Sequence, residues 1–510
     1  MDIAANILER LIEAGFLLAL PWPAWRLAMF RPFRYQGSKK AIALAGLLAA
    51  YSLLVVALAI FAPALLRSLA ILGFLTAFGL VWWMWRGSSR GRRALPGKIK
   101  LLPWGPYLDH RFYQRQADRY GPIFKTGSTL PCPSLRPTVC IVGHKAGLDL
   151  LRQHDDALQL WPPAPFSLLF PKGFLRYMNQ DDHQVYNHLF RSAFSPNFLK
   201  RCSTAIDSEA TVALSRMAAD AKTGQAGGVK PRPYLDQMLF AVFARVLLGI
   251  RPGSDAFEKL QQLYQQVNIP RLMLRSSQKK AQENLGRLTD FIVEEAQRDQ
   301  TDSGHSVSLL SEIARVDPTK LDDPTILGNL IFMLESGCND VGGLLMWVLK
   351  HLGDHPEWIE RLQDQTPCPE NLRSLADRIV SETLRLEQSE YLHRKAIRDL
   401  EFGDYVIPKG WLIRICIRDG HQDSQIFKDP AKFDPDRFID RKFSHIEYAP
   451  FGLFRHMCVG DRLTHEIACT FLAALAKSYD LEATEDGPPE HTRFHWAPNP
   501  DFRLRLTTKD

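Results

Sequence analysis

Residues 448–468 read YAPFGLFRHMCVGDRLTHEIA, a Pro-Phe-Gly loop that ends in Cys458 and then enters a helical pattern. A cysteine in this position has its sulfur close to backbone N–H groups and to the N-terminus of a helix. Both favour the thiolate, so we expect them to lower the pKa of the thiol and to make Cys458 a candidate soft metal ligand. A loop cysteine packed into the core fits the same local pattern, and this stretch alone leaves both interpretations open.

Two shorter motifs precede this loop in the sequence. ETLR, at residues 382–385, places Glu382 and Arg385 three positions apart on one helical face, where a carboxylate and a guanidinium can pair. FDPDRF, at residues 433–438, supplies a second arginine, Arg437, that can share the charge. Such a network could hold the Cys458 loop in place. A Glu-x-x-Arg pair is also common on solvated helices, so its meaning depends on the motifs that follow it.

In this order, the motifs resemble the cytochrome P-450 family from about Leu101 onward. The cysteine loop is similar to the family's haem-binding signature, Phe-x-x-Gly-x-Arg-x-Cys-x-Gly, at Phe451, Cys458 and Gly460. The resemblance implies haem b with Cys458 as the axial thiolate ligand of the iron. It also implies the cytochrome P-450 fold, which is mainly α (α+β) with a small β region, and a structural network of Glu382, Arg385 and Arg437.

The sequence departs from the family signature at two positions of the loop. Phe454 stands where the family has Gly, and His456 stands where it has Arg. Buried haem propionates need cationic or hydrogen-bonding partners. The resemblance suggests Arg394, His456 and His183 for this role, although His183 lies in a helix where Asn187 or His188 replaces the arginine that is often found. Each histidine could instead be a structural or surface residue.

The stretch ESGCNDVGGLLMWVLKHLGDHPEW, from residue 335, resembles the family's long helix on the distal side of the haem. Ser336-Gly337 then matches the small-residue pair, Asn339 the usual acid and Asp340 the usual threonine. The resemblance implies that Asn339 and Asp340 occupy the catalytic proton-delivery positions. A carboxyl group desolvated over an apolar haem face should have a raised pKa, so Asp340 could donate a proton itself. Alternatively, the register has drifted and Asp340 faces a hydrated groove.

Periodicity predicts a mostly helical body. Helical periodicity appears at Gln262–Arg298, Pro324–His351 and Asn371–Leu386. Alternating β-branched and aromatic residues predict strands near Ile123–Lys125, Thr138–Val142, Leu400–Ile415 and Phe502–Leu506. No GxGxxG or P-loop motif is present in the sequence, so no nucleotide-binding half is expected.

Two apolar stretches near the N-terminus, residues 41–63 and 68–85, predict a transmembrane helical hairpin with a turn at residues 65–67. Basic residues flank both outer ends, so the positive-inside rule places the body on the cytoplasmic face, at the endoplasmic reticulum or a bacterial inner membrane. Residues 11–30 contain two prolines and read as interfacial or re-entrant. We therefore expect a membrane anchor and hinge at residues 1–100 and a catalytic domain at residues 101–510.

Charge and cysteine usage exclude other classes of protein. The first hundred residues carry 13 Lys+Arg and three acids, whereas the rest carries 50 bases and 53 acids. Without a continuous basic surface, the body is not expected to bind nucleic acid. The eight cysteines include no CxxC pair and no closely spaced Cys/His set, so they predict reduced thiols and no zinc site.

The first interpretation is a membrane-bound haem-thiolate monooxygenase that inserts one oxygen atom from O₂ into an apolar substrate. Residues 161–174, WPPAPFSLLFPKGF, lie where the family has a loop lining its substrate pocket, although an apolar loop covering a core fits equally well. No flavin or iron–sulfur motif is present, so a separate NAD(P)H-dependent reductase or a ferredoxin must supply the electrons. The alternatives are a haem-thiolate isomerase, dehydratase or peroxygenase that needs no O₂ activation, and a non-catalytic haem-binding protein.

Overall fold

The computed structural model describes most of the 510 residues of the chain. The described residues are 14, 17, 38–87, 92–99, 105–127, 137–160, 173–223, 227–267, 275–301, 307–387, 391–491 and 495–509. The apolar stretch at residues 161–170 and Cys132 lie outside them, as do most residues of the predicted interfacial segment 11–30.

The two predicted N-terminal helices are present as α4 (Ser38–Phe61) and α5 (Pro63–Gly87). The turn between them is at Ala62, so its predicted position at residues 65–67 is wrong. Pro63 explains the difference, because a proline has no N–H to continue the hydrogen-bond ladder of α4 but fits the first position of a new helix. Within the part of the chain that the structure describes, no helix combines the length and the apolar character needed to cross a membrane.

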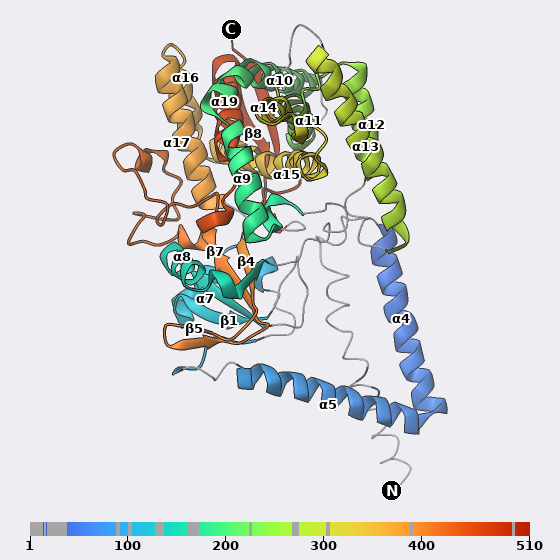
Figure 1. Ribbon diagram of the computed structural model, residues 1–510. Helices are drawn as coiled ribbons and strands as arrows, with labels where there is room; N and C mark the ends of the chain where they lie inside the picture. Colours follow the sequence, from blue (N-terminus) through green and yellow to red (C-terminus); the bar gives the residue numbers. More distant parts are fainter. Residues whose placement is uncertain are drawn as a thin grey trace.

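Helix α4 runs downward from below α13 at the right of the view, and α5 turns back beneath the sheet (Figure 1). Their inner faces meet at Val55, Leu66 and Ala70, which form a small cluster with Ala14 and Leu17. Many large apolar side chains on their outer faces are exposed, with Phe61 at 84% and Leu53 at 71%. These helices therefore pack mainly against each other and leave an apolar surface uncovered.

One five-stranded sheet lies below the helical body, in strand order β1-β2-β7-β4-β3 (Figure 1). Strands β2 and β7 are parallel, and the other neighbours are antiparallel. The five strands are β1 (Ile123–Thr126), β2 (Thr138–Val142), β3 (Leu158–Leu160), β4 (Tyr391–Ala396) and β7 (Leu412–Cys416). Every residue of β2 and β7 is buried, as expected for central strands covered on both faces.

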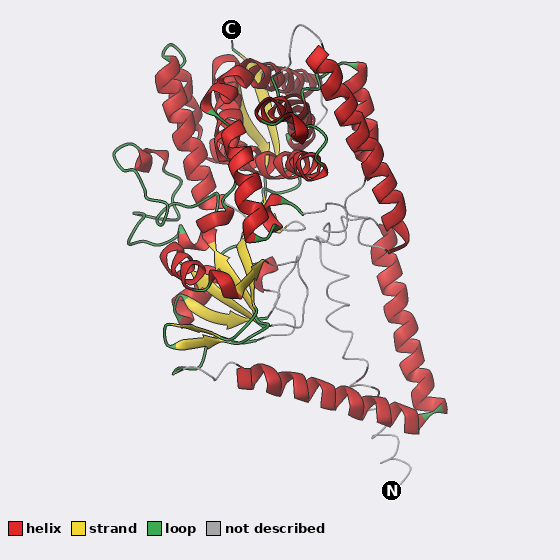
Figure 2. Cartoon of the chain, in the orientation of Figure 1, coloured by secondary structure: helices red, strands yellow, loops and turns green. Residues whose placement is uncertain are grey.

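Three two-stranded pairs complete the β structure of the described residues. They are β5 (Leu400–Phe402) with β6 (Tyr405–Ile407), β8 (Tyr479–Glu485) with β11 (Arg503–Thr508), and β9 (Glu490–His491) with β10 (Trp496–Ala497). Figure 2 shows that helices dominate the body and that most strands gather below it. The prediction of a mainly helical α+β fold with a small β region is therefore confirmed.

The helices of the body vary from single turns to eight or more turns. The first half contains α6 (Gly105–Leu108), α7 (Phe112–Tyr120), α8 (His144–Gln153), α9 (Gln180–Ala193), α10 (Pro196–Thr223), α11 (Arg232–Leu248), α12 (Asp255–Val267) and α13 (Arg275–Thr301). The second half contains α14 (Leu309–Val316), α15 (Pro324–Asp354), α16 (Pro356–Asp364), α17 (Pro369–Glu387), α18 (Ile417–Gly420) and α19 (Asp461–Ser478). Short 3₁₀ turns include Leu175–Tyr177, Pro435–Phe438 and Phe454–His456.

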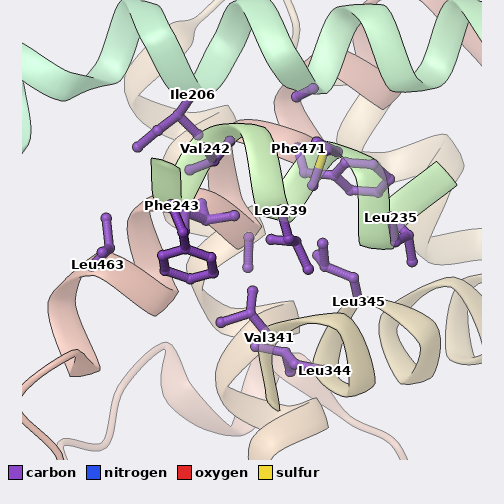
Figure 3. Packing of buried hydrophobic residues seen from close by; sticks show 14 of the residues in the cluster. Ile206, Leu235, Leu239, Val242, Phe243, Val341, Leu344, Leu345, Leu463 and Phe471 are labelled. Atoms are coloured by element: carbon purple, nitrogen blue, oxygen red, sulfur yellow. The ribbon is translucent and has the colours of Figure 1, made fainter. Parts of the chain in front are cut away.

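The long helix α15 lies at the centre of the helical core and contacts α11, α17 and α19. Asp323 caps its N-terminus by accepting a hydrogen bond from the N–H of Thr325 at 2.8 Å, and Pro324 occupies its first position. Figure 3 shows the packing between α11 and α15, where Leu239 and Phe243 face Val341 and Leu344. This core fixes the position of α15 relative to the helix that follows the cysteine loop.

The observed elements agree with most of the predicted ones. The predicted helices at Pro324–His351 and Asn371–Leu386 correspond to α15 and α17, and the predicted strand at Thr138–Val142 is β2. The periodic stretch Gln262–Arg298 is not one helix in the described residues, since α12 ends at Val267 and α13 begins at Arg275.

Candidate active site

The cysteine loop is held by backbone hydrogen bonds and leads into helix α19. The N–H of Gly452 donates to the carbonyl of Ala449 at 3.0 Å, and the N–H of Cys458 donates to the carbonyl of Phe451 at 2.9 Å. Gly452 has a φ of 96°, in the left-handed region that glycine adopts without steric cost. The loop therefore folds back on itself and presents Cys458 just before the first turn of α19.

Cys458 is exposed to the cavity that it lines, and protein atoms surround its thiol on the other sides. Burial raises the pKa of the Cys458 thiol to about 11, and this outweighs the N–H of Gly460, which donates to Sγ at 3.4 Å and acts in the opposite direction. The N–H of Gly460 acts in the predicted direction, but the prediction that the pKa is lowered overall is wrong for the polypeptide alone. A thiol bound to a metal ion is deprotonated outright, so a bound iron would supply the charge that the backbone does not.

Phe454 has a left-handed backbone with a φ of 64°. The left-handed conformation costs an L-residue roughly 1–2 kcal/mol because of its Cβ, which explains why a glycine suits this position of the loop. The Phe454 ring offsets part of this cost by its packing. It contacts the cluster around Leu453 and lies under the guanidinium of Arg455, whose Cζ is 5.1 Å from the ring centroid.

This geometry predicts the relative stability of two variants. Phe454→Ala and Phe454→Gly lose the same ring contacts, but only Phe454→Ala keeps a Cβ in the left-handed backbone. We expect the Gly variant to be more stable than the Ala variant by about 1 kcal/mol, measured by urea unfolding. An Ala variant that equals or exceeds the Gly variant would show that residue 454 is not left-handed in solution.

A cavity of about 300 Å³ lies between helix α15 and the cysteine loop. Its wall is mostly apolar and includes Phe194, Phe243, Phe332, Leu344 and Leu392. Both Cys458 and Asp340 line this cavity, and the charge of Asp340 is one of the influences that raise the pKa of the Cys458 thiol. The structure thus brings the predicted axial ligand and the predicted proton donor to one cavity.

Helix α15 presents its predicted functional residues to this cavity. Ser336, Gly337, Asn339 and Asp340 all line it. Gly337 lies directly against Phe243, because a Cβ at this position would be 2.5 Å from the Phe243 ring and the ring would have to move. The side-chain amide of Asn339 donates to the carbonyl and the carboxylate of Glu335, at 3.0 and 3.2 Å. The Asn339 amide is therefore held by its own helix.

The three predicted propionate partners lie near one another, although only the two histidines line the cavity. The rings of His183 and His456 are 3.9 Å apart, and His456 Nδ1 is buried with no hydrogen-bond partner among the described residues. Arg394 is buried on strand β4, where its guanidinium donates to the carbonyl of His393 at 2.9 Å. Burial lowers the pKa of Arg394 to about 10, and the charge of Arg176 contributes.

Electrostatics at this cluster favour an anionic ligand. Burial, with His183 and Arg394 nearby, lowers the pKa of His456 to about 3. Arg176, from the turn Leu175–Tyr177, lines the cavity and adds a further positive charge that the sequence prediction missed. Two carboxylates would relieve this repulsion and could accept a hydrogen bond from His456. The donor set and the thiol of Cys458 therefore fit a haem with its propionates.

A second missed residue, Arg191, supports the cysteine loop from helix α9. Its guanidinium donates to the carbonyl of Cys458 at 3.2 Å and lies 3.4 Å from that of Met457. The sequence prediction had considered Asn187 and His188 at the usual arginine position of this helix, but Arg191 lies one turn further along. The spacing of four residues from Asn187 places both on one helical face, and this signal could have identified Arg191.

The predicted network of Glu382, Arg385 and Arg437 is assembled and almost completely buried. Arg385 donates to the two carboxylate oxygens of Glu382 at 2.7 and 2.9 Å, and Arg437 Nε lies 2.9 and 3.0 Å from the same oxygens. The N–H of Asp434 adds a bond at 2.9 Å. Glu382 and Arg385 are fully buried, so this is not a solvated surface pair.

Part of the cavity wall is polar, and the sequence did not predict it. Glu387, at the end of α17, lines the cavity and lies 3.1 Å from the ring of His110 and 3.9 Å from that of His351. Burial lowers the pKa of His351 to about 4, and Glu387 has a lowered pKa because His110 and His351 counteract its burial. The sequence carries no local motif for this pair, because His110 and Glu387 are far apart in the chain.

Comparisons with known proteins agree with this geometry. A family model described as Cytochrome P450 matches residues 106–502. Abscisic acid 8'-hydroxylase 2 from Arabidopsis thaliana is 25% identical over 438 residues, covering 79% of this chain and 88% of the relative. Ent-kaurenoic acid oxidase 1 from the same plant is 28% identical over 396 residues, covering 69% and 77%. A retinoic acid-bound cyanobacterial CYP120A1 structure superposes with a TM-score of 0.64 at 22% identity, covering 80% and 96%.

Proposed function

This chain belongs to the cytochrome P450 family and is a haem-thiolate monooxygenase, and from this premise we propose that Cys458 holds the iron of haem b and that Asp340 delivers protons during the reaction. When bound, the haem supplies the iron that activates O₂, and a thiolate ligand favours cleavage of the O–O bond. One oxygen atom enters the substrate and the other leaves as water, which consumes two electrons and two protons. The observation that carries the proposal is that Asp340 and Cys458 line the same cavity.

The remaining predicted site residues take supporting roles in this proposal. His456, His183 and Arg394, with Arg176, would bind the haem propionates, because Arg394 and Arg176 supply positive charge and the two histidines can donate hydrogen bonds beside Cys458. Phe451 accepts a hydrogen bond from the N–H of Cys458, and Gly460 donates one to Sγ, so both orient the ligand. Asn339 has no titratable proton and would instead fix the helix beside Asp340 through its bonds to Glu335.

The substrate we propose is an apolar organic molecule. Aromatic and aliphatic side chains form most of the cavity wall, and they would exclude water and bind the substrate by burying its apolar surface. The relatives named above are a hydroxylase and an oxidase of organic acids by name. A redox partner, either an NAD(P)H-dependent reductase or a ferredoxin, would dock beside the cysteine loop, where Arg191, Arg455 and Arg462 are exposed.

The proton-delivery role of Asp340 predicts a specific loss of coupling. Asp340→Ala should keep haem and substrate binding but lower product formation by on the order of 100-fold, with reducing equivalents diverted to hydrogen peroxide. Asp340→Thr should retain part of the activity, because a hydroxyl can still relay protons. The measurement is product and peroxide formed per NAD(P)H consumed, with substrate binding followed by the shift of the Soret band.

Asn339→Ala is the matched control for this experiment. It removes a polar side chain from the same cavity wall but no acid, so we expect a smaller loss and little extra peroxide. If Asp340→Ala turns over with unchanged rate and coupling, proton delivery by Asp340 is wrong. A haem-thiolate isomerase, dehydratase or peroxygenase, which needs no O₂ activation, would then be the better account.

We further propose that residues 1–100 are a membrane anchor and hinge and that helices α4 and α5 hold the body on a bilayer. Their uncovered apolar surface, with Phe61, Leu53 and Leu72 among the exposed side chains, supports this role. That both helices cross the bilayer, with the body on the cytoplasmic face of the endoplasmic reticulum or a bacterial inner membrane, stays a prediction.

Removal of residues 1–93 tests the anchor. We expect a folded, haem-binding protein that is released from the membrane fraction, because the described side chains of α4 and α5 contribute nothing to the two main hydrophobic clusters of the body. Ultracentrifugation and the spectrum of the reduced, CO-treated protein report both properties. A truncated protein that cannot bind haem would contradict the separation of anchor and catalytic domain, whereas weak residual membrane binding would not.

A further inference from the structure

Three potential metal ligands converge between helices α17 and α19, outside the cavity described above. They are Asp377 from α17 and His465 and Cys469 from α19, and their ligand atoms all lie within 4.8 Å of one another. We infer that these residues form a binding site for a single Zn²⁺ ion. The inference does not depend on the proposed roles of Asp340 or of the haem.

The arrangement matches the preferences of zinc in both chemistry and geometry. Zinc binds thiolate, imidazole and carboxylate at about 2.0–2.3 Å, which puts the ligand atoms of a tetrahedral site roughly 3.3–3.8 Å apart. His465 and Cys469 are separated by four residues, so they lie on one face of α19, and Asp377 approaches from the neighbouring helix. Three protein ligands leave the fourth position to a water molecule.

His465 and Asp377 already face each other at the distance of a hydrogen bond. His465 Nδ1 lies 2.7 Å from a carboxylate oxygen of Asp377. A metal ion would take the place of the proton between them, and the two atoms would move apart by about 0.6 Å to reach the tetrahedral spacing of a nitrogen and an oxygen ligand. The ring proton then resides on Nε2, and the thiol proton of Cys469 is released to solvent as the S–Zn bond forms.

The charges around the site balance when zinc is bound. The thiolate of Cys469 and the carboxylate of Asp377 together neutralise Zn²⁺. Arg373 lies nearby and pairs with Glu466 at 2.9 Å, so this neighbouring pair is neutral overall. Burial raises the pKa of the Cys469 thiol to about 12, against the positive charge of Arg373, so a metal ion would have to displace the thiol proton. The pKa of Asp377 is lowered, because His465 and Arg373 together outweigh its burial.

Zinc can reach the site from the protein surface. The Asp377 side chain is 51% exposed and that of His465 is 21% exposed, whereas Cys469 is fully buried beneath them. The ring of His465 also lies 5.7 Å from the ring of Phe451 in the cysteine loop. An ion entering from outside would therefore meet the carboxylate first and the thiolate last, and it would fix a histidine that contacts the loop.

The sequence had predicted no zinc site because its cysteines and histidines form no familiar spacing. The pair at His465 and Cys469 is only four residues apart, but its third ligand is 88 residues earlier in the chain. Only the packing of α17 against α19 brings Asp377 to the pair. The absence of a local motif therefore did not exclude a zinc site.

The test is zinc binding by the haem-loaded, full-length protein after dialysis against a chelator. Equilibrium dialysis against zinc chloride, with metal analysis of zinc per haem, should give one zinc per chain. Cys469→Ala and His465→Gln should each weaken binding by at least on the order of 100-fold, and Asp377→Asn by less because its side-chain oxygen remains. Zinc should also raise the unfolding temperature of the wild-type protein but not of Cys469→Ala.

Two controls separate this site from adventitious thiol or histidine binding. Cys368→Ser, near the start of α17, and His445→Gln, an exposed histidine, should bind zinc like the wild type. An unchanged thiolate-type CO spectrum in each variant shows that it is folded. The proposal is overturned if the wild type takes up no more zinc than Cys469→Ala, or if Cys469→Ala and His465→Gln bind zinc with wild-type affinity.

Discussion

Glu382→Ala is expected to abolish haem incorporation and stable expression together. The substitution leaves the buried guanidiniums of Arg385 and Arg437 without their counter-ion, which costs roughly 3–5 kcal/mol. This is a large share of the 5–15 kcal/mol by which a protein is typically stable. The measurements are the haem content and the urea unfolding curve of the purified variant.

The effect should reach the haem because the network is linked to the cysteine loop by hydrogen bonds. Arg385 donates to the carbonyl of His421 at 3.0 Å, and Nε2 of His421 accepts from the N–H of Ala449 at 3.0 Å. Tyr448, at the start of the loop, donates its hydroxyl proton to the carbonyl of Ser381 at 2.9 Å. Ser381, which precedes Glu382, and Arg385, which pairs with it, are therefore both linked to the loop by hydrogen bonds.

Two further variants sharpen this experiment. Arg385→Lys keeps the charge but cannot make the two parallel bonds to Glu382, so it should also be damaging. Glu360→Ala, an exposed glutamate on the neighbouring helix α16, should be nearly neutral. A haem-replete, active Glu382→Ala protein would show that the network does not support the cysteine loop.

The local sequence predicted the helices and the buried network well, because their signals lie close together in the chain. Glu382 and Arg385 share one helical face, and α15 has a proline at its start and an aspartate cap. Strand β4 was missed because its buried face carries a charged residue, Arg394, between Leu392 and Ala396. A charged residue at a buried position interrupts the alternation of apolar and polar residues by which strands are recognised.

Features that depend on tertiary burial could not be predicted in this way. The loop around Cys458 places a backbone donor near the sulfur, as expected, but desolvation of the thiol by the surrounding protein reverses the direction of the pKa shift. Arg176 joins the candidate propionate partners from a separate turn that carries no motif. In each case the property depends on what surrounds a side chain, and those surroundings are formed by segments distant in the sequence.

Cys458→Ser is expected to abolish the thiolate-type spectrum of the reduced, CO-treated protein and with it all monooxygenase activity. A serine hydroxyl is neutral and binds ferric haem poorly, so the strongly red-shifted Soret band that reports a thiolate should disappear. The fold should persist, because the side chain faces the cavity and contributes little to the core. Absorption spectroscopy and circular dichroism on the same sample separate loss of the ligand from loss of the fold.

The other cysteines provide matched controls, and their surroundings make the expected outcome clear. Cys140 and Cys416 are fully buried in the core around the sheet, and Cys202 is buried among the helices, so none of them lines the cavity. Cys368→Ser changes a partly exposed thiol at the start of α17 and should leave the spectrum unchanged. Cys132, outside the described residues, should behave in the same way. If Cys458→Ser keeps the red-shifted band, another cysteine must hold the iron, and the assignment of the axial ligand to this loop is wrong.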